Sequence, residues 1–273
     1  MANYIIHHKR RSFFGNFSIT NQLIFVNIIL YIASIFILSI YGKEFFLDNL
    51  AITPPLILEG KNLWTFITSM FFHGGFFHIF ANMFSLFFIG NFLEKIIGRV
   101  RFIWVYLLSG LIGGIFFVLS GMIFSNNLPG VGASGAIFGL LGVLAVLVPY
   151  SKIYLIVGPL ILIFLQFTFR TSIPANFLPT FTMIINILII LMIFSIFSFN
   201  PNMRRFAVPL ELPMWLLPII AIVPLVILDF IPGINLPIGN SAHIGGLAIG
   251  LLYGFYLRKK FPRKISMIRK HFR

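Results

Sequence analysis

The sequence predicts an all-α polytopic membrane protein with about eight helices. Three observations predict this class. The 273 residues are 59% hydrophobic and only 10% charged, whereas soluble domains are about 45–50% apolar and about 25% charged. The mean hydropathy is +1.02. The apolar residues also form runs of membrane-spanning length. A soluble α/β enzyme, a disordered chain and a collagen-like fibre are therefore excluded.

The apolar runs define the expected helices in chain order. They lack the alternation of barrel strands and are too long for them. The first run is expected to be an uncleaved signal anchor. The fifth and sixth runs, within 153–199, could cross twice or form a re-entrant hairpin. The runs are 20–41, 77–97, 101–125, 134–150, 153–169, 178–199, 213–230 and 241–257. The stretch 42–75 mixes charges with Phe, Leu and Pro, so we expect it to lie in the membrane interface.

The basic residues indicate sidedness rather than nucleic-acid binding. With the N-terminus inside and eight alternating helices, 17 of the 20 Lys and Arg residues fall on the cytoplasmic side, and only Lys43, Lys61 and Arg170 fall outside. This asymmetry is typical of the positive-inside rule. The expected organisation is a cytoplasmic tail (1–19), a membrane domain (20–258) with an inserted apolar segment (152–203), and a basic cytoplasmic tail (259–273). The absence of cysteine excludes disulfides and a cysteine nucleophile.

Ser134 is the first candidate for chemistry. It lies in Gly132-Ala133-Ser134-Gly135, a glycine-rich turn that leads into an apolar helix. The positive end of a helix dipole suits a developing oxyanion, but a serine hydroxyl is a poor nucleophile until a base takes its proton. Small residues also serve helix packing in membranes, which is the alternative reading.

His243 supplies the candidate base. Gly246, Gly250 and Gly254 follow it at offsets that place all three within about 60° of the histidine on a helix. Such a glycine track allows close approach of another helix, and the helix after Ser134 has its own small face. Docking the two faces would bring His243 near Ser134. A buried histidine that is satisfied by a carbonyl is the alternative.

His73, His78 and Asn82 form the third element. Positions 78 and 82 are four residues apart and share one helix face. An amide and an imidazole N–H that point together can stabilise an oxyanion. Interhelical hydrogen bonding by Asn82 is the alternative. His73, at the loop junction, is expected to be structural and to pin the 42–75 loop by hydrogen bonding.

Other membrane chemistries lack their residues. No histidine is followed by the glutamate of a His-Glu-x-x-His zinc motif. The two aspartates, Asp48 and Asp229, do not form an intramembrane pair. Buried acids for a coupled transporter are not evident. We expect no metal and no cofactor, and serine chemistry remains.

Together these motifs resemble the rhomboid intramembrane serine proteases. The resemblance covers roughly 20–150 and 205–258. Its residues are His73-x-x-x-x-His78-x-x-x-Asn82, Gly132-Ala133-Ser134-Gly135 with Phe138-Gly139, Ala242-His243 with Gly246 and Gly250, Trp64, and Glu94-Lys95 with Gly98. The sequence departs from the family in three places. Thr65 stands where many members have arginine, Phe138 where some have tyrosine, and 152–203 is longer than the usual link.

The resemblance implies a rhomboid-like six-helix core with an additional helical pair, and a Ser–His dyad. Ser134 would be the nucleophile and His243 the general base and then acid. His78, Asn82 and the Ser134 N–H would hold the oxyanion. Structural support would come from His73, Gly132, Gly135, Phe138, Gly246 and Gly250. Span 213–230 would be the gate, and 152–203 is expected to modulate access to it.

The implied substrates are single-span membrane proteins cut near the outer face, in what is expected to be a prokaryotic cell membrane. The bilayer is the expected environment, with no nucleic acid and no obligate protein partner. Two alternatives remain open. One is a rhomboid-fold protein that binds membrane clients without cutting them, although such proteins typically lack the serine or the histidine. The other is a small-solute channel or carrier.

Overall fold

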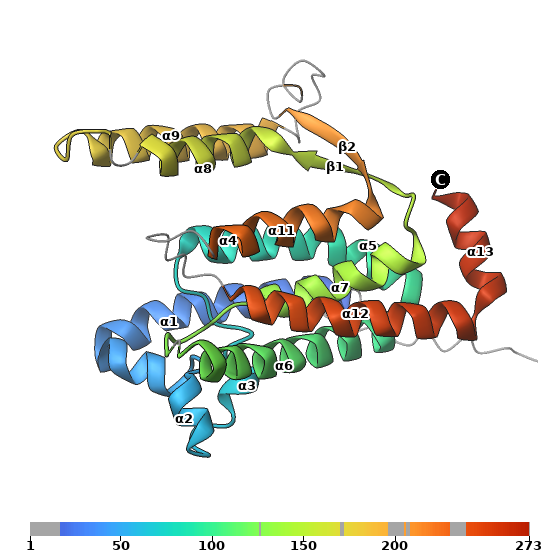
Figure 1. The fold of residues 1–273 in the computed structure, drawn as a ribbon, viewed down its shortest axis with the longest axis horizontal. Coiled ribbons are helices and arrows are strands. Elements are labelled where there is room, and N and C mark those ends of the chain that lie inside the picture. The colour runs from blue at the N-terminus through green and yellow to red at the C-terminus, as the bar shows by residue number, and fades with distance from the viewer. Residues whose placement is uncertain are drawn as a thin grey trace, which may run out of the picture. The chain divides into compact units, whose positions relative to one another are not determined.

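The computed structural model describes residues 17–125, 127–169, 172–195, 205, 208–229 and 239–272. Most of the basic N-terminal tail, Arg170 and the last part of the predicted insertion lie outside the described residues. The chain divides into two compact units, of which the first comprises Met1–Pro149 and Trp215–Phe272 and the second Tyr150–Met214. The ribbon in Figure 1 shows that helices dominate the described part, which confirms the predicted all-α class.

The first unit contains the helices that correspond to the predicted core. Its helices are α1 (Ile19–Asn49), α2 (Pro54–Leu58), α3 (Thr65–Thr68), α4 (Phe76–Ser85), a π-helical turn η2 (Leu86–Gly90), α5 (Asn91–Ile97), α6 (Arg99–Phe124), α7 (Ser134–Leu147), α11 (Leu217–Asp229), α12 (Asn240–Lys260) and α13 (Pro262–His271). In the described residues, four helical segments are long and apolar enough to cross a membrane: Ile19–Asn49, Phe76–Ile97, Arg99–Phe124 and Leu178–Ser195. The chain is therefore an integral multi-pass membrane protein.

The first apolar run ends where it was predicted to end. Gly42, with φ 81° and ψ 174°, interrupts the helix after residue 41, so α1 consists of two helical segments that meet at a kink. Only glycine takes this conformation readily. The remaining part of 42–75 contains the short helices α2 and α3. Its hydrogen bonds return to the end of α1, since the Trp64 indole donates to the Asn49 carbonyl and the Asn62 amide to the Asp48 carbonyl.

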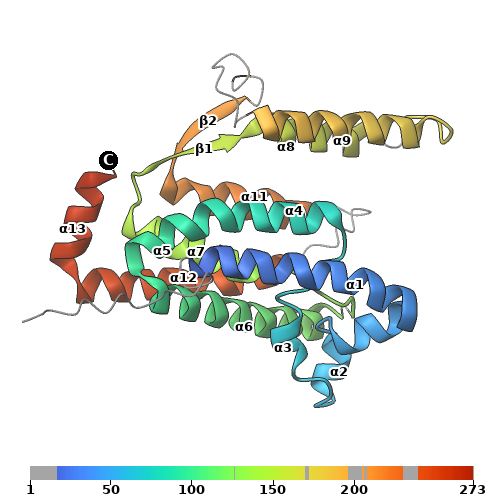
Figure 2. The same cartoon turned by 180° about the vertical axis from the view of Figure 1, so that it is seen from behind.

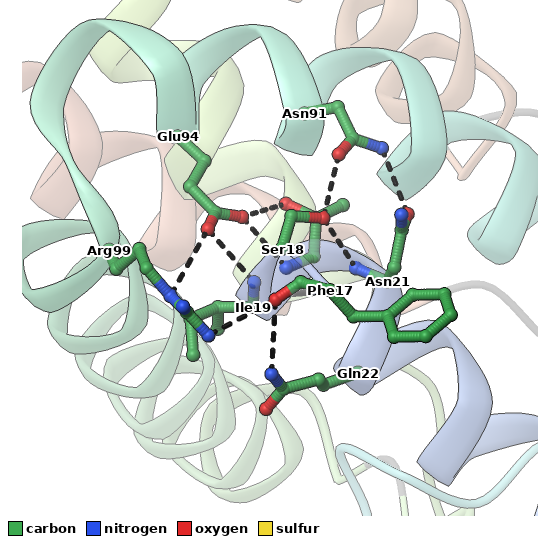
Figure 3. A network of polar contacts seen from close by, with 9 residues as sticks. Phe17, Ser18, Ile19, Asn21, Gln22, Asn91, Glu94 and Arg99 are labelled. Atoms are coloured by element: carbon green, nitrogen blue, oxygen red, sulfur yellow. Dashed lines mark hydrogen bonds and ion pairs between the residues drawn. The ribbon is translucent and has the colours of Figure 1, made fainter. Parts of the chain in front are cut away.

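Glu94 fixes the start of α1. Its carboxylate, in α5, accepts hydrogen bonds of 2.8 Å from the backbone N–H groups of Ile19 and Thr20 and from the Thr20 hydroxyl. Arg99 lies 3.9 Å from the same carboxylate. Figure 3 shows this network around the first turn of α1. The first N–H groups of a helix lack partners within it, and a carboxylate also suits the positive end of the helix dipole.

Helix α12 packs along both α6 and α7 and forms the centre of the first unit. Figures 1 and 2 show the three helices side by side from opposite directions. The seam between α7 and α12 is made of glycines, and the α7 side chains Leu140 and Leu144 are fully buried. Because apolar lipid gives little hydrophobic drive to helix association, close backbone packing is what holds such helices together.

The second unit contains a feature that the sequence did not predict. Strands β1 (Lys152–Ile156) and β2 (Pro209–Pro213) form an antiparallel ribbon in which Lys152 pairs with Pro213. Helices α8 (Val157–Phe169) and α9 (Leu178–Ser195) pack together as a hairpin. The apolar run from residue 153 was expected to be helical throughout. A short apolar run does not by itself distinguish a strand from a helix, and the pairing partner lies far along the chain.

Candidate active site

Ser134 is the first residue of α7, and the loop before it is shaped by two backbone contacts. Gly130 pairs with Ile52 in an isolated β-bridge, with both N–H···O distances at 2.9 Å. The Gly132 N–H donates to the Ser69 carbonyl at 2.8 Å. The first N–H groups of a helix have no partner within the helix. Ser134 therefore lies at a helix terminus whose N–H groups and dipole favour negative charge.

His243, in the first turn of α12, faces Ser134. Its Nε2 lies 2.8 Å from the Ser134 Oγ, a hydrogen-bonding distance, across 109 residues of sequence. The imidazole stacks on the Phe138 ring with a centroid distance of 4.4 Å and an interplanar angle of 23°. Phe138 is one turn after Ser134 on α7, so one helix supplies both the hydroxyl and the aromatic surface. The Nδ1 atom of His243 has no hydrogen-bond partner among the described residues, and no carboxylate orients the ring there.

The glycines of the two helices explain why this pair can meet. A Cβ at Gly246 would overlap the carbonyl oxygen of Gly135, and one at Gly250 would overlap the carbonyl oxygen of Gly139. The backbones of α7 and α12 are therefore in direct contact at both positions. The glycine faces of α7 and α12 therefore pack against each other, as the sequence predicted. Gly246 lies three residues after His243, so the contact sits within one turn of the imidazole.

His78 and Asn82 approach the same loop from α4. Gly132 has φ +131°, and a Cβ there would lie 2.7 Å from His78 Nε2 and 3.8 Å from Asn82 Nδ2. Both nitrogens thus converge on the Gly132 backbone, two residues before Ser134. One proton of the Asn82 amide is donated to the His78 carbonyl at 3.0 Å. The second amide proton remains for another acceptor. Glycine is required at 132 both by its dihedral angle and by this approach.

His73 is buried beside this group. The backbone of Phe71, in the same loop, approaches its ring as a weak hydrogen-bond partner, although the contact is not a well-aligned hydrogen bond. The ring meets His78 edge-on at a centroid distance of 5.1 Å. Burial, with a smaller contribution from His78, lowers the pKa of His73 to about 3. The ring is therefore neutral and packed within the loop, and its role in pinning the 42–75 loop stays a prediction.

The sequence reasoning missed the contacts that connect the 42–75 loop to the serine loop. These are the Ile52–Gly130 bridge and the hydrogen bond from Gly132 to Ser69. Both use backbone groups, which carry no residue signature. A further missed contact is Arg269, in α13, which donates to the carbonyl oxygens of Val146 and Leu147 at the end of α7. In the described residues, no group of three or more His, Cys, Asp or Glu side chains could hold a metal ion.

Comparison with known proteins gives the family. A family model described as the Rhomboid domain matches residues 60–193 and 182–260. RHOMBOID-like protein 4 of Arabidopsis thaliana is 30% identical over 201 residues, which are 74% of this chain and 36% of that relative. The rhomboid YdcA of Bacillus subtilis is 43% identical over 81 residues, 29% of this chain and 39% of that relative. Inactive RHOMBOID-like protein 8 of Arabidopsis thaliana is 38% identical over 86 residues, 32% and 23% of the two chains.

The fold and the site define a multi-pass membrane protein with a serine–histidine pair between two closely packed helices. The chain belongs to the rhomboid family. The matched regions span only about a quarter to two fifths of the length of these curated relatives. One of the relatives is named inactive. The activity of this chain is therefore argued from its own residues.

Proposed function

We propose that this protein is an intramembrane serine endopeptidase that cleaves transmembrane segments with the dyad Ser134 and His243. The observation that carries the proposal is the 2.8 Å separation of the Ser134 Oγ and the His243 Nε2. A serine hydroxyl needs an adjacent base to become nucleophilic, and an imidazole at this distance can take its proton. A non-proteolytic client-binding protein has no need of this pair.

The reaction would proceed by acyl transfer. The Ser134 Oγ attacks the scissile carbonyl while its proton passes to His243, which then gives the proton to the leaving amine. The oxyanion would be held by the Ser134 N–H and by the side chains of His78 and Asn82, whose nitrogens both approach the Gly132 backbone. The Phe138 ring supports one face of the imidazole. In the second half of the reaction, a water molecule gives a proton to His243 and attacks the acyl-enzyme. His243 then returns the proton to the Ser134 Oγ, which frees the second product.

The substrates we propose are single-span membrane proteins, cut near the outer face of the membrane. Helix α11, with Pro224 inside it, would be the movable element through which they enter, because an internal proline removes a helical hydrogen bond. The charge distribution supports cytoplasmic termini. The location we propose is a bacterial cell membrane; the relatives reported above come from both a bacterium and a plant. No obligate protein partner is needed for this chemistry.

Activity-based labelling tests the proposal. The purified parent should react with a fluorophosphonate and cleave a test transmembrane segment in liposomes. Ser134→Ala should lose both labelling and cleavage. His243→Ala should lose cleavage by about 10⁴-fold or more, since removing either member of a serine–histidine pair disables the nucleophile. His78→Ala and Asn82→Ala should each cost about 10²–10³-fold in kcat, the usual loss for one oxyanion donor.

Ser34→Ala is the matched control. Ser34 is buried in α1 and its hydroxyl donates to the carbonyl of Tyr31 in its own helix, so this variant removes a buried serine far along the chain from the dyad. It should label and cleave like the parent. Equal cleavage by Ser134→Ala and the parent would refute the dyad. A parent that neither labels nor cleaves, yet binds the test segment, would favour the client-binding alternative.

A further inference from the structure

Positive charge gathers at the end of the first unit that lies away from the dyad. The last turn of α12, the whole of α13, the end of α5 and the start of α6 meet there. Arg101 lies 5.1 Å from the centre of the Phe261 ring, and Phe92 packs edge-on against Phe272 at 5.0 Å. The basic residues of these four segments are Lys95, Arg99, Arg101, Arg258, Lys259, Lys260, Arg263, Lys264, Arg269 and Lys270. Within the same described segments, Glu94 is the one acid, and it is buried against α1.

Helix α13 has two different sides. Ile265 is only 6% exposed and faces the unit, while Arg263, Lys264 and Lys270 are exposed. Met267 is 66% exposed on that outer side, between the basic side chains. In the described residues no carboxylate forms an ion pair with the three outer cations. The outer side is thus a cationic surface with one exposed apolar side chain among its charges.

The start of α6 places this surface at the level of the lipid headgroups. Helix α6 is one of the described segments that are long and apolar enough to cross a membrane, and it begins with Arg99 and Arg101 at this end of the unit. The ends of a membrane-spanning helix lie at the edges of the hydrocarbon core, which is about 30 Å thick. Helix α12 packs along α6, so its final turn and α13 lie at the same level. Both views show α13 turning away from the line of α12 at this end (Figures 1 and 2).

We propose that α13 and the last turn of α12 form a binding site for anionic phospholipid headgroups. The occupant follows from the position and the charge. Lys and Arg side chains extend their charged ends to the phosphate level, and each contributes about fivefold to the affinity for an anionic surface. Arg263, Lys264 and Lys270 form no ion pair with a carboxylate of the described residues, so the headgroups would supply their counter-charge.

The site is connected to the serine helix through one side chain. Arg269 Nε donates to the Leu147 carbonyl at 3.0 Å, and its Nη2 donates to the Val146 carbonyl at 2.7 Å. The last carbonyls of a helix lack partners within it, and Arg269 supplies two of the missing donors. Headgroups that hold α13 would thereby steady the end of α7. We therefore expect phosphatidylglycerol to stimulate cleavage. This expectation rests on the proposed function, whereas the binding itself does not.

The binding is tested with the full-length protein by native mass spectrometry. Short-chain phosphatidylglycerol and phosphatidylcholine are titrated separately and a dissociation constant is obtained for each. The parent should prefer phosphatidylglycerol, and Lys264→Gln with Lys270→Gln should reduce that preference about 25-fold. The matched control, Lys43→Gln with Lys61→Gln, removes two exposed lysines from the loop region and should keep it. Equal losses in both double variants, or no preference in the parent, would overturn the proposal.

Two further measurements test whether the bound anion belongs to a lipid and whether Arg269 connects the site to α7. Free glycerol phosphate should not displace the lipid, and displacement at equal concentration would mean that the site takes a soluble anion rather than a lipid. Arg269→Lys keeps the charge but loses the two-pronged contact. It should bind phosphatidylglycerol within about twofold of the parent, while the stimulation of cleavage by phosphatidylglycerol disappears. A parent-like stimulation would refute the connection. Because binding is read without proteolysis, an inactive parent would contradict only the proposed function.

Discussion

Replacing Gly246 by alanine tests the helix contact on which the site depends. A Cβ at this position would overlap the carbonyl oxygen of Gly135 and stand 2.8 Å from its carbonyl carbon. Carbon atoms at van der Waals contact are about 3.5 Å or more apart. Since both obstructing atoms belong to a helix backbone, no side-chain rotation relieves the overlap. The two helices must separate by about 1 Å.

The separation has two measurable consequences. Overpacking of this kind costs about 1–3 kcal/mol in unfolding free energy. It also lengthens the 2.8 Å contact between His243 and Ser134, which lies one turn away. A misplacement of about 1 Å can reduce a rate about 10²-fold. We therefore expect a stability loss of about 1–3 kcal/mol and a fall in kcat of about 100-fold.

Unfolding by heat or denaturant in micelles, followed by circular dichroism, measures the loss of unfolding free energy. Initial rates of cleavage of a test transmembrane segment measure the fall in kcat. Gly75→Ala is the control, because a Cβ there meets nothing within 4 Å and the backbone is extended at φ 171°. It should behave like the parent. If Gly246→Ala is as stable and as active as Gly75→Ala, the glycine seam does not set the distance between the dyad residues.

Three further outcomes are expected. Glu94→Gln removes the charge that caps α1 and should lower the unfolding free energy by about 1–2 kcal/mol, whereas Glu59→Gln, at an exposed ion pair, should change it by less than about 0.5 kcal/mol; equal effects would contradict the capping role. The pKa of His73 is about 3 when folded, below its ordinary 6.5. Its contribution to stability is therefore complete above pH 6.5 and decreases as the pH falls towards 3. Between pH 6.5 and 4 the parent should lose about 2–3 kcal/mol more than His73→Gln in denaturant titrations, and parallel curves would refute this. The Trp215 N–H donates to the Pro149 carbonyl at 3.1 Å, so replacing residues 150–214 by a short turn should leave a folded first unit. We expect altered cleavage rates in liposomes, and unchanged rates would remove the proposed role of the insertion in gate access.

Much of the fold was accessible from the sequence because membrane insertion depends on local composition. A run of about 20 apolar residues must satisfy its own backbone and therefore forms a helix. The predicted runs 77–97 and 101–125 correspond closely to Phe76–Ile97 and Arg99–Phe124. The β-ribbon at 152–156 and 209–213 was not accessible, since strand pairing between distant segments leaves no period in either one. The break at Gly42 agrees with the predicted end of the first run at residue 41, whereas the helical turns between Gly42 and Asn49 were not predicted.

The candidate site divides in the same way. The residue types in the glycine-rich turn, the His78–Asn82 pair and the glycine track after His243 were enough to predict serine chemistry. Which groups touch was decided by tertiary packing. The sequence placed His73 at a loop junction, but only the folded loop shows that its ring lies edge-on against His78. It also gave no sign that Arg269 would reach the end of α7.

The sequence by itself determined that this protein lies in a lipid bilayer, the order of its helices, and which few polar residues lie within them. These properties depend on composition and on spacing along one helix. Only the tertiary structure decided that the hydroxyl and the imidazole stand 2.8 Å apart. That distance depends on how closely two backbones approach where side chains are missing, and close approach is a property of a pair of helices that neither one encodes alone.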